Sequence, residues 1–323
     1  MNAEPQETNL ESPASIVKRK KALNWRDPFK RMLDNPVILK ELRGRMRDRQ
    51  AFVLLTVYLG AIAVFISIVY ALLADQSSYG GWDPSFRQTV GKVIFGAVVL
   101  LELLLVSFIG PGLTAGAITA ERERQTFDLL RTTLLSARSL VLGKLGSAFT
   151  YMFLLILTAL PIQSIAFLLG GVGLGEMVVS SVMLLVTAIF FCTLGIFFSS
   201  FMKRTLTATV SSYGALLSSF LFIIVIFFLI AYLEALPSKT GPVFELMVSA
   251  SVWFLISTNP YLAAIFTEVI LVEEQSLFFT KNSLFSNSPI YLPSPWIIYV
   301  VVYLLMTMLM IFISIRKVRR PDR

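Results

Sequence analysis

The sequence predicts an all-α integral membrane protein with six transmembrane helices. Of its 323 residues, 56% are hydrophobic and 15% are charged, whereas about a quarter of the residues in a soluble globular chain are charged. The mean hydropathy of the chain is +0.75. Apolar runs of about twenty residues recur along it, and a helix of that length crosses the hydrocarbon core of a bilayer.

The apolar runs predict six spans within a permease domain at 51–315. They cover 51–74, 92–114, 145–170, 176–201, 205–234 and 296–315. Only Met202-Lys203-Arg204 separates the fourth span from the fifth, which predicts a tight hairpin. Gly110-Pro111-Gly112 is expected to end the second span, and Pro161 to kink the third, because proline interrupts helical hydrogen bonding.

The N-terminal fifty residues are predicted to stay outside the bilayer. Residues 1–24 are polar and are expected to be disordered, and no cleavable signal peptide is apparent. Asp34-Asn35-Pro36 is a helix-start pattern, and the apolar side of the following segment predicts an interfacial elbow helix at 25–50. A basic flank without a defined helix is the alternative. A basic tail at 316–323 ends the chain.

The basic residues predict the orientation of the spans. Lys and Arg number twelve before the first span, five in 115–144, two in the hairpin and five in the tail, against four on the other side. This distribution predicts a multi-pass protein of the cell inner membrane with both termini cytoplasmic. It also predicts contact of the basic residues with anionic lipid, and no binding of nucleic acid.

The residue types needed for several kinds of catalytic site are missing. The chain has no histidine, which excludes histidine-dependent hydrolases and most zinc sites. Its single cysteine, Cys192, falls inside a span and is predicted to be a buried apolar residue. Gly91-Lys92 and Gly143-Lys144 lack the rest of a phosphate-binding loop. The chain is therefore predicted to be non-enzymatic, with no catalytic, cofactor or metal site of its own.

The outer segment at 235–295 is rich in proline and contains two apolar stretches, 243–257 and 261–272. Each stretch is too short for a span. Short helices that enter the outer leaflet or lie on it are expected, because two further crossings would disturb the distribution of basic residues.

The loop between the second and third spans carries a charged insert that is predicted to form a helix at about 119–136. Three apolar residues recur at spacings of three and four: Phe127, Leu130 and Leu134. Three charged residues of alternating sign recur at spacings of four and three: Arg124, Asp128 and Arg131. Both patterns are typical of an amphipathic helix.

Two groups of polar residues are candidates within the spans. Glu102 lies near the middle of the second span, where a charge is costly, so it is either part of a substrate path or interface or a hydrogen-bonded packing residue. The fifth span is rich in small residues, including Ser211 and Ser218, which favours close contact between helices. A dimer or bundle interface is the natural use of that span, and a polar conduit lining is the alternative.

The insert resembles the cytoplasmic loop of ABC transporter permeases of the type 2 exporter class (ABC-2 type). In that loop an E-x-E-x-G-T-x-x-x-L-L pattern is followed by Pro-Ser/Thr-x-R and then G-K. The matching residues are Glu121, Glu123, Thr126, Leu129, Leu130, Arg138, Gly143 and Lys144. Gln125 and Leu135 depart from the pattern, standing where glycine and proline are common. The Asn35-Pro36…Lys40-Glu41-Leu42-Arg43 elbow and the six-span plan extend the likeness over most of the chain.

The resemblance implies that the 119–136 helix is a coupling helix that docks on a separate ABC ATPase subunit, which would bind ATP and magnesium. Phe127 and Leu130 would be the apolar anchors, with Glu121, Glu123, Arg124, Thr126 and Arg131 around them. The permease would pair with itself or a sister subunit and export a substrate along the second and fifth spans. An ATP-independent channel or carrier, and a membrane scaffold, are the alternatives.

Overall fold

We describe the protein from a computed structural model. The structure describes residues 44, 49–77, 84–126, 136–168, 170–234, 242–274, 276–282 and 290–319. The predicted N-terminal tail and elbow helix therefore lie almost entirely outside the described residues, as do the tip of the charged insert and the last four residues.

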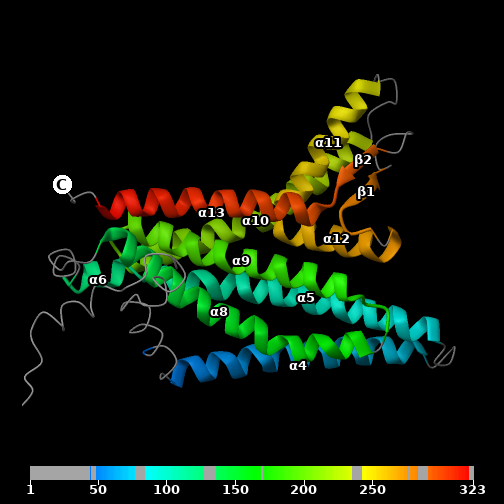
Figure 1. Ribbon diagram of the computed structural model, residues 1–323, viewed down its shortest axis with the longest axis horizontal. Coiled ribbons are helices and arrows are strands. Elements are labelled where there is room, and N and C mark those ends of the chain that lie inside the picture. The colour runs from blue at the N-terminus through cyan, green and yellow to red at the C-terminus, as the bar shows by residue number, and fades with distance from the viewer. Residues whose placement is uncertain are drawn as a thin grey trace, which may run out of the picture.

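The six predicted spans are confirmed as helices. Within the described residues, six helices are long and apolar enough to cross a membrane. They run alongside one another in a single bundle (Figure 1) and comprise α4 (Arg49–Ser77), α5 (Pro84–Thr114), α8 (Ala137–Leu168), α9 (Leu174–Phe201), α10 (Thr205–Glu234) and α13 (Pro295–Arg319).

The segment Gly110-Pro111-Gly112 does not break the second span as predicted. Helix α5 continues through Pro111 and ends at Thr114, the predicted last residue of the span, and the turn begins at Ala115. The glycines serve packing instead, because a Cβ on Gly110 would meet Phe191 and the backbone of Cys192 on α9 at 3.0–3.3 Å. Small residues let two backbones approach closely inside a membrane. Helix α8 likewise runs through Pro161.

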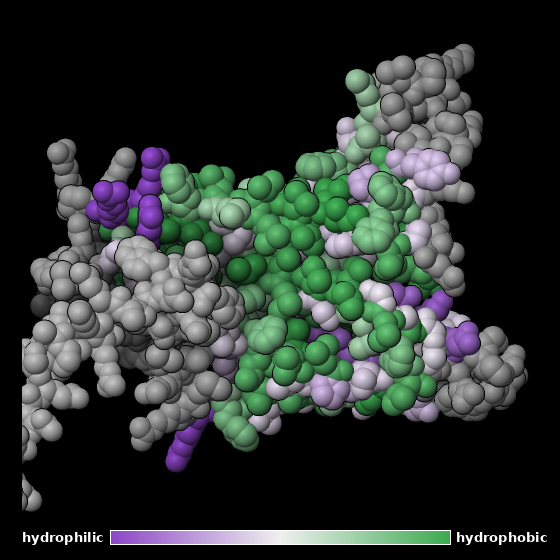
Figure 2. Space-filling view, viewed as in Figure 1, coloured by the Kyte–Doolittle hydropathy of each residue, from purple (hydrophilic) through white to green (hydrophobic). Residues whose placement is uncertain are grey.

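Helices α5 and α9 form the centre of the bundle, and α4 and α10 lie at its periphery. Large fully buried side chains come from several helices, among them Leu103, Met152 and Tyr299. Cys192 is buried, as predicted. On the face shown in Figure 2, apolar residues form a broad band with hydrophilic residues toward both ends, which is the surface that a bilayer requires.

The outer segment forms two short helices, as predicted, and a hairpin that was not predicted. Helices α11 (Pro242–Thr258) and α12 (Pro260–Glu274) meet at a bend of 111°. Asn259 occupies the bend, where its Oδ1 accepts the backbone N–H groups of Tyr261 and Leu262 at 3.1 and 3.2 Å, and so caps α12. Strands β1 (Phe279–Asn282) and β2 (Ile290–Pro293) then pair antiparallel before α13.

The short helix α6 (Thr119–Glu123) lies at the end of the bundle where α4 begins and α13 finishes (Figure 1). Helices α11 and α12 and the β-hairpin lie at the opposite end. The charged insert and the last residues of α13 are therefore on one side of the apolar surface, as the distribution of basic residues requires.

Candidate functional site

The candidate site is the base of the charged insert, where α6 joins the long helices. A turn at 115–118 leads from α5 into α6. The hydroxyl oxygen of Ser199, on α9, accepts the backbone N–H groups of Ile118 and Thr119 at 2.9 and 3.1 Å. One buried side chain of α9 thus satisfies two amides at the start of α6 that lack helical partners.

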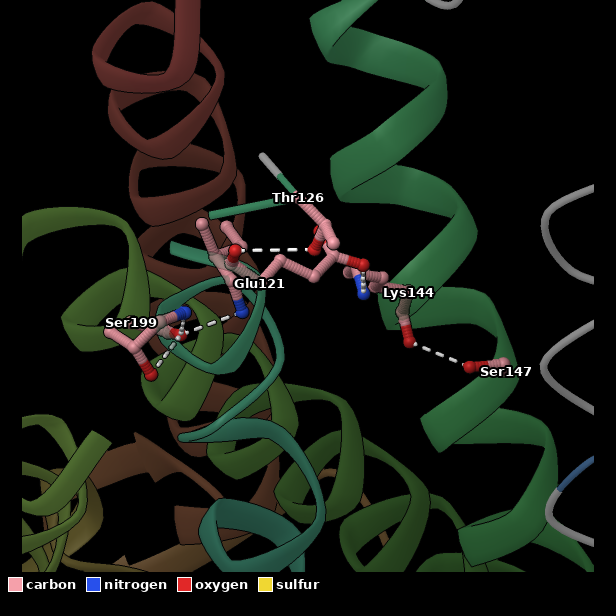
Figure 3. A network of polar contacts seen from close by, with 7 residues as sticks. Glu121, Thr126, Lys144, Ser147 and Ser199 are labelled. Carbon is pink, nitrogen blue, oxygen red and sulfur yellow. Dashed lines mark hydrogen bonds and ion pairs between the residues drawn. The ribbon is translucent and has the colours of Figure 1, made fainter. Parts of the chain in front are cut away.

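An ion pair joins α6 to α8. Lys144 Nζ lies 2.8 Å from Glu121 Oε1 (Figure 3). The side chain of Lys144 is 7% exposed and that of Glu121 is 25% exposed, so the pair is largely shielded from water. Shielding from water strengthens the attraction between the two charges, and it also makes either charge costly without the other.

A second carboxylate of α6 caps the N-terminus of α10. Glu123 Oε1 accepts the backbone N–H of Thr205 at 2.7 Å, and Oε2 accepts its hydroxyl at 2.8 Å. A negative charge is favourable at a helix N-terminus. Next to it, the Arg122 guanidinium donates to the carbonyl of Met202 at 3.0 Å. Helix α6 therefore contacts α8, α9 and the hairpin between α9 and α10.

Helix α6 ends in a Schellman motif. The N–H of Gln125 donates to Arg122 O, and the N–H of Thr126 donates to Glu121 O, both at 3.0 Å. Gln125 has φ +58°, the left-handed conformation that glycine adopts most easily. This is the position where the ABC-2 pattern commonly has glycine.

The prediction of one continuous helix over 119–136 is therefore wrong, because the helix that begins at Thr119 ends at Glu123. The chain turns out of the helix at Gln125, because the Schellman bonds satisfy the last carbonyls of α6. Glu123, Arg124 and Thr126 are exposed at this end. The predicted anchors Phe127 and Leu130 and the predicted rim residue Arg131 lie outside the described residues, so the structure neither places nor orients them.

Sequence reasoning identified Glu121, Glu123 and Lys144 but not their contacts. Ser199, Thr205 and Arg122 were missed as partners of this segment, although they hold it in place. A partial signal was available for Thr205, because a hydroxyl residue directly after the Lys203-Arg204 turn is typical of a helix start.

Glu102 lies inside the subunit. It is fully buried, and its Oε2 accepts a hydrogen bond from Gln163 Nε2 on α8 at 2.8 Å. Its Oε1, the Oε1 of Gln163 and the hydroxyl of Tyr58 are buried without a hydrogen-bond partner. In this arrangement Glu102 packs against its own subunit, and a role in a substrate path stays a prediction.

The small residues of α10 are divided between two faces. Ser212 is buried against the subunit, whereas Gly214 and Ser218 are exposed and Ser211 is half-buried. The hydroxyl of Ser218 donates to the carbonyl of Ala215 within the same helix. The exposed side of α10 thus combines small residues with large apolar ones such as Leu217 and Leu221.

No protein-family model matches this chain, and no curated protein matches it.

Proposed function

We propose that this protein is the membrane-spanning permease subunit of an ATP-binding cassette transporter, an exporter driven by a separate ATPase subunit that docks on the charged insert. The observation that carries the proposal is the fixation of α6. An ion pair to α8, a capped N-terminus on α10 and two hydrogen bonds from Ser199 hold this short helix against three spans.

Fixation matters because a docking element can drive transport only if its displacement reaches the spans. A loosely held loop would absorb the motion of an ATPase, whereas an element bonded to several helices carries them with it. Arg124, which is exposed and follows these contacts, would form part of the polar rim of the interface, whereas the carboxylate of Glu123 is bonded to Thr205. The apolar anchors Phe127 and Leu130 complete the proposed contact.

The same proposal includes a dimer of permease subunits, formed with a second copy or a sister chain. The small and apolar residues on the exposed side of α10 support close helix contact there. The substrate path would run between the two subunits, beside α5 and α10. Both termini and the insert would be cytoplasmic.

Co-purification tests the proposal. The tagged full chain is isolated in mild detergent, and a stoichiometric ATPase is expected with it. The double variant F127D/L130D is expected to lose the ATPase, because two acidic groups replace the anchors of a desolvated contact. F127L/L130M keeps both positions apolar and should retain it. Each variant is first checked for an unchanged size-exclusion profile.

Two outcomes would overturn the proposal. Transport that persists after ATP depletion, with no ATPase bound, would indicate a channel or secondary carrier. A reconstituted complex that binds partners but transports nothing would indicate a scaffold. Retention of the ATPase by F127D/L130D would remove the insert from the interface and leave the rest of the proposal standing.

A further inference from the structure

A groove of about 800 Å³ lies between the start of α8 and the end of α13, at the same end of the bundle as α6. It is separate from the contacts that hold α6. Both helices contribute to its lining, which consists of Ser136, Ala137, Arg138, Met308, Ile311, Phe312, Ile315, Arg316 and Arg319.

The polar end of the groove is strongly basic. Among the described residues that line it, three are arginines and none carries a carboxylate. The N-terminus of α8, a helix of 32 residues, opens beside Arg138, with Ser136 accepting the N–H of Ser139 at 3.2 Å. A helix N-terminus adds partial positive charge to that of the arginines. Their shared chemistry selects an anion.

The other end of the groove is apolar. Met308, Ile311 and Ile315 lie at helical spacing along one side of α13, and Phe312 stands next to them. The Arg316 guanidinium lies 4.7 Å from the centre of the Phe312 ring. This contact places the positive charge where the basic end of the groove meets its apolar end. The apolar side belongs to a helix that crosses the membrane, so it faces the acyl-chain region.

We propose that this groove binds one anionic phospholipid of the leaflet that borders the α6 end. The phosphate would lie among Arg138, Arg316 and Arg319, and an acyl chain would lie along Met308, Ile311 and Ile315. Basic pockets between transmembrane helices on the cytoplasmic side are suited to such headgroups. The apolar wall gives no affinity to inorganic phosphate, and a water-soluble acidic peptide would leave it exposed to the bilayer.

The proposal does not depend on an ATPase partner. A lipid in this position would contact both the first turn of α8 and the last turns of α13, which are far apart in the sequence. Lipid binding would therefore hold together two helices at their polar ends, where water competes with their packing.

Native mass spectrometry of the purified full chain provides the test. Phosphatidylglycerol and phosphatidylcholine are added in equal amounts, and the ratio of the first bound lipids is measured. Wild-type protein should favour phosphatidylglycerol. R138Q/R316Q should lower that preference roughly thirtyfold, since each of the two arginines near an anionic surface contributes about 1 kcal/mol. K203Q/R204Q removes the same charge from the exposed α9–α10 hairpin at the same end and should leave the preference unchanged.

A separate pair of measurements identifies the occupant. Inorganic phosphate in hundredfold excess should not displace phosphatidylglycerol, and I311S/I315S should weaken lipid binding while the arginines remain. Equal binding of the two lipids by wild type, an unchanged preference in R138Q/R316Q, or an equal loss in K203Q/R204Q would overturn the proposal. So would displacement by phosphate. Loss of a bound protein from R138Q/R316Q with lipid retained would assign the groove to a protein partner instead.

Discussion

Lys144 of α8 and Glu121 of α6 form an ion pair at 2.8 Å, and the lysine is the more deeply enclosed partner. The two residues are separated by 23 positions in the sequence. Their contact joins the two ends of the charged insert, because Glu121 lies at its start and Lys144 lies just after its end.

The enclosure of both charged groups predicts a cost for removing either partner. E121Q takes the counter-charge from an enclosed ammonium group, and K144Q leaves a carboxylate whose Oε2 is buried without a hydrogen-bond partner, so each change should destabilise the protein by about 2 kcal/mol. Unfolding in detergent measures both costs. The double variant E121Q/K144Q should cost less than the two single changes added together. Additive costs would mean that the contact contributes no coupling energy.

Gln125 predicts a second pair of effects, because its left-handed backbone disfavours most side chains. Q125G should leave stability unchanged or raise it by up to about 1 kcal/mol, since glycine adopts this conformation without strain. Q125V should destabilise by about 1–2 kcal/mol, because a β-branched side chain tolerates positive φ least. Thermal unfolding midpoints in detergent distinguish the two. If Q125V is as stable as Q125G, α6 does not end in this motif.

The bond between Glu102 and Gln163 predicts a rescue. Replacing Glu102 by leucine leaves the buried amide of Gln163 without its acceptor and should cost about 1–3 kcal/mol. The double variant E102L/Q163L removes both polar groups and should recover a substantial part of that loss, as judged by the unfolding midpoint. A double variant less stable than E102L would show that this polar contact organises the core beyond its own hydrogen bond.

Two glycines predict opposite responses to the same small change. A Cβ on Gly195 would collide with Thr114 Oγ1 and meet the backbone N of Ala115 at 3.0 Å, so G195A should destabilise the subunit by about 1–3 kcal/mol. A Cβ on Gly214 meets nothing within 4 Å, so G214A should be tolerated. G214L should likewise preserve the subunit and weaken the proposed dimer, which cross-linking would detect. A dimer unaffected by G214L would exclude this face of α10.

The spans could be predicted from the sequence because a run of apolar residues is sufficient to identify each of them. Twenty apolar residues form a helix in a bilayer whatever their neighbours are, so the six helices were predicted within a few residues of their cores. The starts of two helices were not, because α5 and α8 begin eight residues before the predicted spans. Polar residues such as Arg138 continue a helix beyond the apolar core, where hydropathy gives no signal.

The candidate site was harder to predict because its contacts are three-dimensional. Periodicity of apolar residues favoured a continuous helix through Gln125, but side-chain spacing does not report a residue with positive φ. The role of Ser199 depends on the packing of α9 against the turn after α5, a contact across 80 and 81 positions. The β-hairpin was missed because strands of four residues are too short to show alternation.

Helix α10 is attached to both ends of the protein by side-chain hydrogen bonds. Glu123 fastens its first residue, and the side-chain amide of Asn259, at the bend between α11 and α12, donates to the carbonyl of Ser219 at 2.8 Å. The two joints are about 21 Å apart along the helix at 1.5 Å per residue. Between the joints α10 packs on the bundle along one side, where Ser212 and Leu216 are buried, and its opposite side is uncovered. A tilt begun at the joint with α6 would therefore shift the bend at Asn259, giving the two ends of the protein a direct mechanical connection.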